Sequence, residues 1–304
     1  MRWYLAHDPG PLPHLFRILY PFWFLRDHTP EGQSWVMQLP PAADPPAAQA
    51  RAELAWTALA AALDVGDDAA ALAASRRLGP LLPGIENPFL RAVSQLAMAW
   101  YAPLAGDYDA ALRAAANSLE QLRRLDEPFW TAMAAGSLGT VERILGRYDD
   151  DALGHLREAH DLGDRLGSTW LSAWSRVQLG TMSILRGDLR QARAVLQEAL
   201  ELSVAARSTG GVTLCLAACA QLAFAEGDRG RAALLAGAAE GLRRRAGLRV
   251  WPTLRQGEDE LVAQVRQTLG AERFDQEFSA GSALTQQQAV ATVRDQRRTG
   301  TQMP

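Results

Sequence analysis

The chain has 304 residues, of which 48% are hydrophobic and 21% charged, with a formal net charge of −3 and a pI near 6.0. This balance is typical of a folded globular protein, and the arginines are spread along the chain rather than gathered into the basic surface of a nucleic-acid-binding protein. All 31 basic residues are arginine. A Walker A phosphate loop, a protein kinase and a Schiff-base enzyme each need a lysine, so all three are excluded in their usual forms.

The chain opens with an aromatic segment, residues 1–39, for which we expect irregular helices. Its most apolar part, residues 15–25, spans only 11 residues and contains Arg17 and Pro21, which makes it too short to cross a bilayer. No basic region followed by an apolar stretch and a small-residue cleavage site precedes it, so we expect a cytoplasmic protein. Four prolines within residues 40–46 interrupt any helix, and we place the end of the opening segment and its link at residue 46.

Five glycine-led turns follow, and their spacing predicts a repeat protein. The glycines stand 40, 40, 41 and 40 residues apart, at Gly66, Gly106, Gly146, Gly187 and Gly227. A period of this size is typical of stacked helical hairpins, none of which can bury its apolar face alone. We therefore predict an all-α, right-handed superhelical α-solenoid, with five repeats of about 40 residues in one continuous array over residues 47–241.

Each glycine is expected to end the first helix of a repeat in the left-handed conformation, and a following aspartate to cap the second helix. An alanine stands five residues after the glycine in four repeats and six after it in the third, at Ala152. An extra aspartate within residues 149–151 accounts for that step, and the predicted insertion shifts the second helix by one residue. The small side chain at this position allows the two helices to approach closely.

The stretch from Ala99 through Gly106-Asp107-Tyr108 to Leu112 resembles the tetratricopeptide repeat (TPR). The usual unit of that family has about 34 residues, so these longer units resemble the maltose-regulator type. Residues 15–39 and 232–290 also resemble the C-terminal region of large actinobacterial LuxR-type or signal-transduction ATPase transcriptional regulators. The resemblance implies the helical regulatory portion of such a protein, as a separate gene product or a fragment. The phosphate-binding loop and the helix-turn-helix of those regulators are not in this sequence, so ATP hydrolysis and DNA binding are not implied.

The closing segment, residues 242–294, is expected to cap the array with two helices broken near Gly270 and Gly281. We interpret the basic cluster of Arg243, Arg244, Arg245 and Arg249 as the complement to the negative end of a helix rather than as a phosphate site. Residues 295–304 have no apolar periodicity and are expected to be disordered.

No pattern in the sequence predicts catalysis, a cofactor or a metal site. Cys215 and Cys219 lie four residues apart and are expected to be buried thiols. His155 and His160 are five apart, which places them about 140° apart around a helix, so they do not converge. A calcium loop needs ligands at set alternate positions, so the aspartates at 149–151 are interpreted as a polar turn. We expect a protein that is not an enzyme.

A binding groove is the expected functional site. The TPR resemblance implies that the first helices line a concave surface, and counting inward positions from each glycine gives nine residues. They are Trp56, Trp100, Met133, Thr140, Arg143, Trp174, Thr181, Gln221 and Phe224. Aromatic side chains and arginine are what binding hot spots favour. The alternative is that the tryptophans pack between neighbouring repeats, because large aromatic side chains are usually buried.

We therefore expect an interaction module of a transcriptional or signalling system, whose groove binds a protein or peptide segment, with a regulatory ATPase or a DNA-binding protein as one class of partner. Direct binding of nucleic acid or membrane is not expected. Two alternatives stay open: a sensor whose groove encloses a small-molecule inducer, and a remnant of a longer regulator.

Overall fold

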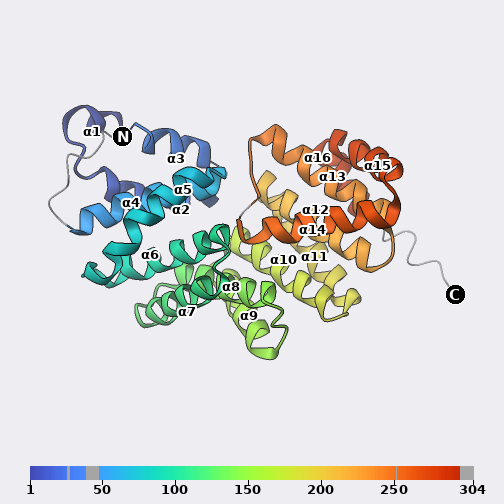
Figure 1. Cartoon of the computed structure of the whole chain (residues 1–304), viewed down its shortest axis with the longest axis horizontal. Coiled ribbons are helices and arrows are strands. Elements are labelled where there is room, and N and C mark those ends of the chain that lie inside the picture. The colour runs from blue at the N-terminus through green and yellow to red at the C-terminus, as the bar shows by residue number, and fades with distance from the viewer. Residues whose placement is uncertain (26–27, 39–47, 251, 295–304) are drawn as a thin grey trace. The chain divides into compact units, whose positions relative to one another are not determined.

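The computed structural model describes residues 1–25, 28–38, 48–250 and 252–294 (Figure 1). The described residues form helices and no strand, and successive helices pack in pairs, which confirms an all-α solenoid of helical hairpins. The proline-rich stretch at 40–46 and the predicted disordered tail lie outside the described residues.

The chain divides into two compact units, although the sequence predicts one continuous array. Unit 1 comprises Met1–Val141 and Arg249–Thr253, and unit 2 comprises Glu142–Leu248 and Leu254–Pro304. The first boundary falls in the last turn of one helix, and the chain crosses between the units again at 248–249, between two helices, and at 253–254.

Unit 1 begins with three helices and continues into the repeats. The opening helices are α1 (Arg2–His7), α2 (Leu12–Leu25) and α3 (Thr29–Val36). The repeat helices are α4 (Ala48–Val65), α5 (Asp68–Leu78), α6 (Pro88–Tyr101), α7 (Tyr108–Arg124) and α8 (Pro128–Ile144), with short 3₁₀ turns at Gly79–Gly84 and Ala102–Ala105. The first 3₁₀ turn and residues 85–87 form the link between the first two repeats, and Pro88 begins α6.

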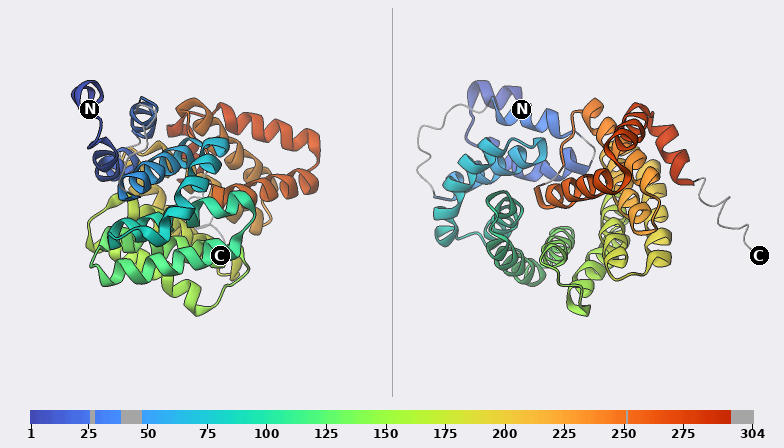
Figure 2. Two further views of the ribbon diagram at one scale, coloured as in Figure 1. Left: turned by 60° about the vertical axis from the view of Figure 1, so that its left-hand side comes forward. Right: turned by 45° about the vertical axis from the view of Figure 1, so that its right-hand side comes forward.

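Unit 2 contains the remaining repeat helices and the closing segment. They are α9 (Asp150–Arg165), α10 (Thr169–Leu185), α11 (Leu189–Ala205), α12 (Thr209–Ala225), α13 (Arg229–Ala246), α14 (Pro252–Leu269), α15 (Ala271–Ala283) and α16 (Gln286–Arg294). Within unit 2 the second helix of the hairpins α10–α11 and α12–α13 lies alongside the first. Figure 2 shows the helices from two further sides.

The glycine-led turns have the predicted conformation. All five lead glycines have positive φ, from 68° at Gly66 to 86° at Gly227. The aspartate side chains that follow accept hydrogen bonds of 2.9–3.1 Å from the first turn of the second helix. The third turn is longer than predicted: α9 begins four residues after Gly146 instead of two, and Asp149 provides the cap. The insertion therefore moves the cap by two residues and the alanine register by one.

A second series of left-handed residues, which the sequence did not reveal, ends the second helices. Asp126, Gly167, Arg207 and Gly247 have φ values of 54°, 61°, 55° and 69°. They follow α7, α9, α11 and α13 at steps of 41, 40 and 40 residues. Two of the four are not glycine, so a search for glycines alone does not find the series.

The closing segment has three helices, not two. Gly270 ends α14 with a φ of 87°, as predicted, but Gly281 lies inside α15. A Cβ atom on Gly281 would lie 1.9 Å from the Leu234 carbonyl oxygen of α13. A Cβ atom on Gly237 or Gly241 of α13 would lie 2.1 or 2.2 Å from a backbone carbonyl oxygen of α15. Gly281 is therefore required for close helix packing rather than for a break, which comes after Ala283 instead.

The basic cluster at the end of α13 binds the closing helices. Arg243 pairs with Glu258 of α14 at 2.6 Å, and Arg244 donates to the Ser282 hydroxyl at 3.1 Å. Arg245 donates to the backbone carbonyl of Ser282 at 2.6 Å. Arg243, Arg244 and Arg245 thus stand in the last turn of α13, and their partners are side chains and a carbonyl of the cap.

Candidate interaction site

Helix α2 lies on the first helices of three successive repeats in unit 1. The ring of Tyr20 meets Trp56 of α4 edge-on at 5.3 Å between ring centroids, and it stacks on Trp130 of α8 at 6.4 Å. Trp130 in turn meets Trp56 at 6.1 Å and Phe89 of α6 at 6.1 Å, both edge-on. Tyr20, Trp56 and Trp130 are buried. We call Trp56, Phe89 and Trp130 the aromatic inner face of unit 1.

Charged groups border this aromatic contact. The guanidinium of Arg17 lies over the Phe89 ring, 5.2 Å from its centroid, and Arg17 Nε lies 3.6 Å from a carboxylate oxygen of Glu53 on α4. His14 Nδ1 is 3.1 Å from the same oxygen. The Glu53 side chain is only 11% exposed. A carboxylate at such a position needs cationic or hydrogen-bonding partners, and here both partners shown come from α2.

The two unit 1 tryptophans predicted to line the groove join neighbouring first helices. Trp56 donates its indole N–H to the Val93 carbonyl of α6 at 3.0 Å, and Trp100 donates to the Ser137 hydroxyl of α8 at 2.9 Å. Their side chains are 0% and 4% exposed. The packing alternative therefore describes both residues in this structure.

The other predicted groove residues are divided between the two units. In unit 1, Met133 and Thr140 are buried, and Thr140 donates to a carbonyl of its own helix. In unit 2, Trp174 and Thr181 of α10 are buried, and Trp174 stacks on Trp170 at 5.7 Å. The three that are only partly buried are Arg143, Gln221 and Phe224. Binding by the groove as a whole stays a prediction.

Arg143 differs from the other eight because it carries an enclosed charge. Its Nε atom is buried without a hydrogen-bond partner, and burial lowers the pKa of its guanidinium to about 10. It lies in the last turn of α8, within unit 2.

The sequence reasoning missed Arg17, Tyr20, Glu53, Phe89 and Trp130. One signal could have found part of the inner face: an aromatic residue stands 17 positions before the lead glycine in three successive repeats, at Phe89, Phe129 and Trp170. No comparable pattern marks the α2 residues, because they lie outside the repeats.

Unit 2 has a wide polar groove formed by α9, α10 and α11. Its volume is about 740 Å³, and its lining includes Arg157, His160, Arg176, Arg186 and Glu198. Arg176 holds the three helices together through Asp164 at 3.0 Å and Glu198 at 3.3 Å.

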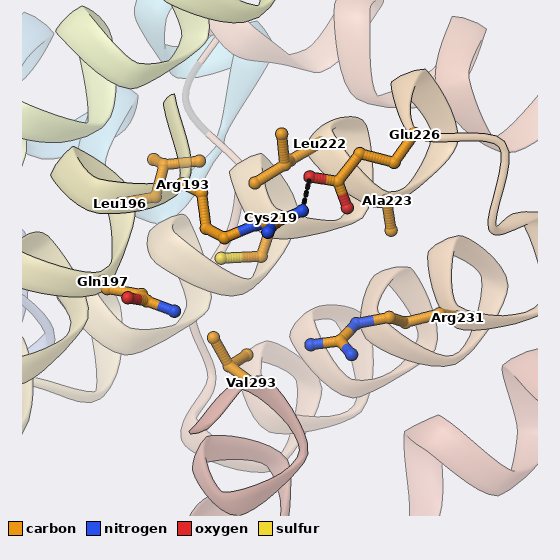
Figure 3. Close-up of a pocket in the computed structure, with 9 residues that line it drawn as sticks. All are labelled: Arg193, Leu196, Gln197, Cys219, Leu222, Ala223, Glu226, Arg231 and Val293. Carbon is orange, nitrogen blue, oxygen red and sulfur yellow. Dashed lines mark hydrogen bonds and ion pairs between the residues drawn. The ribbon is translucent and has the colours of Figure 1, made fainter. Parts of the chain in front are cut away.

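A much smaller cavity lies between α11, α12 and α16 (Figure 3). Its volume is about 10 Å³, which leaves room for no more than a water molecule. Arg193 and Glu226 pair across it at 2.6 Å, and Val293 of α16 closes one side. It is a packing defect rather than a ligand site.

The cysteines and histidines of the sequence analysis lie in unit 2. Cys215 and Cys219 are buried free thiols, and burial raises the pKa of Cys215 to about 12. His155 pairs with Glu142 and His160 with Asp164, so the two imidazoles do not meet. Within the described residues, no group of three or more histidine, cysteine or acidic side chains could hold a metal ion. None of the described helices combines the length and the apolar character that crossing a membrane requires.

No described protein family matches the sequence, and no curated protein matches it. Among solved structures, the chain is similar to a Rap protein complexed with competence and sporulation factor, with a TM-score of 0.64 and 12% identity over 94% of this chain and 86% of that one. It is also similar to BtubC from P. vanneervenii, with a TM-score of 0.50 and 16% identity over 73% of this chain and 90% of that one. The chain has a TPR-like helical-repeat fold. At these identities the likeness concerns the fold alone, and the resemblance to LuxR-type regulators stays a prediction.

Proposed function

We propose that the chain is a non-enzymatic interaction module that binds a protein or peptide segment on the inner face of its first helices. The observation that carries the proposal is α2, a helix with basic and aromatic side chains that occupies this face in unit 1. A surface that holds one such helix has the chemistry to hold another. The Rap protein of similar fold was solved in complex with competence and sporulation factor, which agrees with a binding role for this fold.

The corresponding face of unit 2 is where we place the part of the groove that is open to a partner. Gln221 and Phe224 on α12 are partly exposed, unlike the buried tryptophans. We further propose that the partner belongs to a transcriptional or signalling system, as the resemblance to regulators with ATPase and DNA-binding domains implies.

Site-specific photo-crosslinking tests the proposal. A photoreactive amino acid replaces Gln221 or Phe224 in one set of chains and the exposed Arg190 of α11 in a control set. We expect one protein or peptide to crosslink from the inner positions and not from Arg190. Equal crosslinking from both positions would contradict the assignment of the inner face.

The polar groove of unit 2 favours a second candidate, a sensor for a small molecule. A volume of about 740 Å³ falls in the range of ligand pockets, and the arginines and carboxylates in its lining suit a polar compound with groups of both charges. Native mass spectrometry of the purified chain checks this: a stoichiometric bound compound that is lost in an Arg157→Ala variant supports the sensor, and a bare chain opposes it.

A further inference from the structure

Helices α1, α2 and α3 have an apolar core of their own, separate from the repeats. Leu12, Phe16 and Trp23 of α2 are buried at its centre. The side chains packed around them come from the same three helices and from Met1, which precedes α1: Met1, Tyr4, Leu5, Leu15, Leu19, Trp35 and Val36. The opening helices therefore form a small body that meets the repeats through α3, which packs on α4, and through one side of α2.

That side of α2 makes its contact through a basic and an aromatic residue. Arg17 and Tyr20 are three positions apart, so they project from the same face of the helix. Tyr20 meets Trp56 and Trp130, and Arg17 lies between the Phe89 ring and Glu53. Aromatic rings attract both other rings and guanidinium groups, so this face of the repeats is matched to an arginine followed by an aromatic side chain.

Helix α2 is also poorly suited to be a permanent part of the fold. Pro21 lies inside it, and an internal proline removes one helical hydrogen bond and strains the preceding turn. On its outer side, Ile18 and Phe22 are 54% and 52% exposed. Because of the internal proline and the exposed apolar side chains, α2 is easier to displace than the regular helices beneath it.

We propose that α2 is a built-in competitor: the inner face of α4, α6 and α8 recognises a partner helix with a basic residue three positions before an aromatic one, and this partner displaces α2. The inference rests on the proposed interaction function and specifies the partner. Glu53 is the basis for the charge requirement, because its carboxylate, 11% exposed, loses the pairing with Arg17 and His14 when α2 leaves. An incoming helix must replace that pairing or leave the carboxylate uncompensated.

A peptide with the sequence of residues 11–25, labelled with fluorescein, serves as the partner surrogate. Fluorescence anisotropy measures its binding to the full chain, to an opened chain with Arg17→Glu and Tyr20→Ala, and to a control chain with Ile18→Ala and Phe22→Ala. We expect the opened chain to bind the peptide about tenfold or more tightly than the wild type, because the intramolecular competitor is weakened. The control chain should behave as the wild type, since its changes lie on the exposed side of α2.

The charge requirement has its own test. A peptide with Arg17→Glu should lose binding to the opened chain. Glu53→Arg should restore it in a chain opened by Arg17→Gln and Tyr20→Ala, whose own α2 offers no carboxylate at position 17 to the new arginine. Circular dichroism checks that each variant keeps its helices; if the double variant does not, Arg17→Gln alone replaces it. Equal binding of the peptide to opened, control and wild-type chains would overturn the proposal.

Two further outcomes distinguish this inference from self-association and from the proposed interaction function. A wild-type chain that sediments as a dimer, with the opened chain a monomer, would assign the face to α2 of a second copy and overturn displacement by a separate partner. If the opened chain does not bind the peptide but Gln221 still crosslinks to a partner, the inference is overturned and the proposed interaction function is retained. Loss of those crosslinks as well would remove both.

Discussion

Trp100 donates its indole N–H to the Ser137 hydroxyl at 2.9 Å, and Trp56 makes the same connection to the Val93 carbonyl one repeat earlier. Donor and acceptor are 37 residues apart in both pairs. Each bond joins the first helix of one repeat to the first helix of the next. Tryptophans that the sequence suggested for binding are thus part of the contact between repeats.

This connection should be measurable as a coupling energy. Trp100→Phe removes the donor and Ser137→Ala removes the acceptor, and each should lower the free energy of unfolding by about 1–2 kcal/mol because a buried polar group loses this partner. The double variant should lose less free energy of unfolding than the two single variants lose together. Urea unfolding of the wild type, the two single variants and the double variant measures this. Trp3→Phe, at a side chain that is 62% exposed, is the control. Strict additivity would contradict the coupling.

The left-handed residues after α7 and α11 offer a stabilising change. Asp126 and Arg207 adopt φ values of 54° and 55°, where an L-residue is strained and glycine is not. Arg207→Gly should raise the free energy of unfolding by about 0.5–1 kcal/mol, after the greater entropy of glycine in the unfolded chain is subtracted. Gly167→Ala, at the equivalent turn, should lower it by about 1 kcal/mol. Thermal unfolding of both variants checks the two expected changes. A destabilised Arg207→Gly chain would contradict the backbone strain assigned to Arg207.

These turns show what the sequence could and could not predict. The lead glycines and their aspartate caps are local chemistry repeated at a fixed period, so Gly66-Asp67 and its equivalents could be read directly. Arg207 adopts the same backbone conformation as Gly167 without a residue type that signals it. The contact of Tyr20 with Trp130 depends on tertiary packing over more than a hundred positions, and no local pattern encodes such a contact.

Close packing of α13 on α15 should make Gly281 intolerant of any side chain. A Cβ atom there would lie 1.9 Å from the Leu234 carbonyl oxygen, so Gly281→Ala must push the two helices apart. We expect a loss of about 2–4 kcal/mol in the free energy of unfolding. Gly257→Ala in α14, where a Cβ meets nothing within 4 Å, should instead stabilise by about 0.5–1 kcal/mol. Denaturant unfolding of the two variants compares them, and similar values for both would refute the close contact.

The thiol of Cys215 should resist modification in the folded chain. Burial raises its pKa to about 12, so the thiol stays protonated at pH 8, and the buried sulfur is shielded as well. Labelling with a maleimide reagent should be slow in buffer and rapid for both Cys215 and Cys219 in urea. Rapid labelling in buffer, followed by mass spectrometry, would show that α12 opens locally far more readily than the repeats around it.

The pairing of Asp164 with Arg176 should make stability depend on pH in the acid range. Hydrogen bonds from Arg176 hold the pKa of Asp164 below its usual value. The folded chain therefore binds a proton at Asp164 less readily than the unfolded chain, so this contribution is present above about pH 4 and is lost as pH falls. Asp164→Asn should lower stability at pH 7 by less than about 1 kcal/mol, because the carboxylate is 45% exposed and solvent screens it. At pH 3 the difference in the free energy of unfolding between this variant and the wild type should be smaller. The control Asp161→Asn, at an exposed position on the same helix, should change the free energy of unfolding little at either pH. Urea unfolding at the two pH values measures both, and a gap that does not vary with pH would mean that the lowered pKa of Asp164 does not contribute to folding.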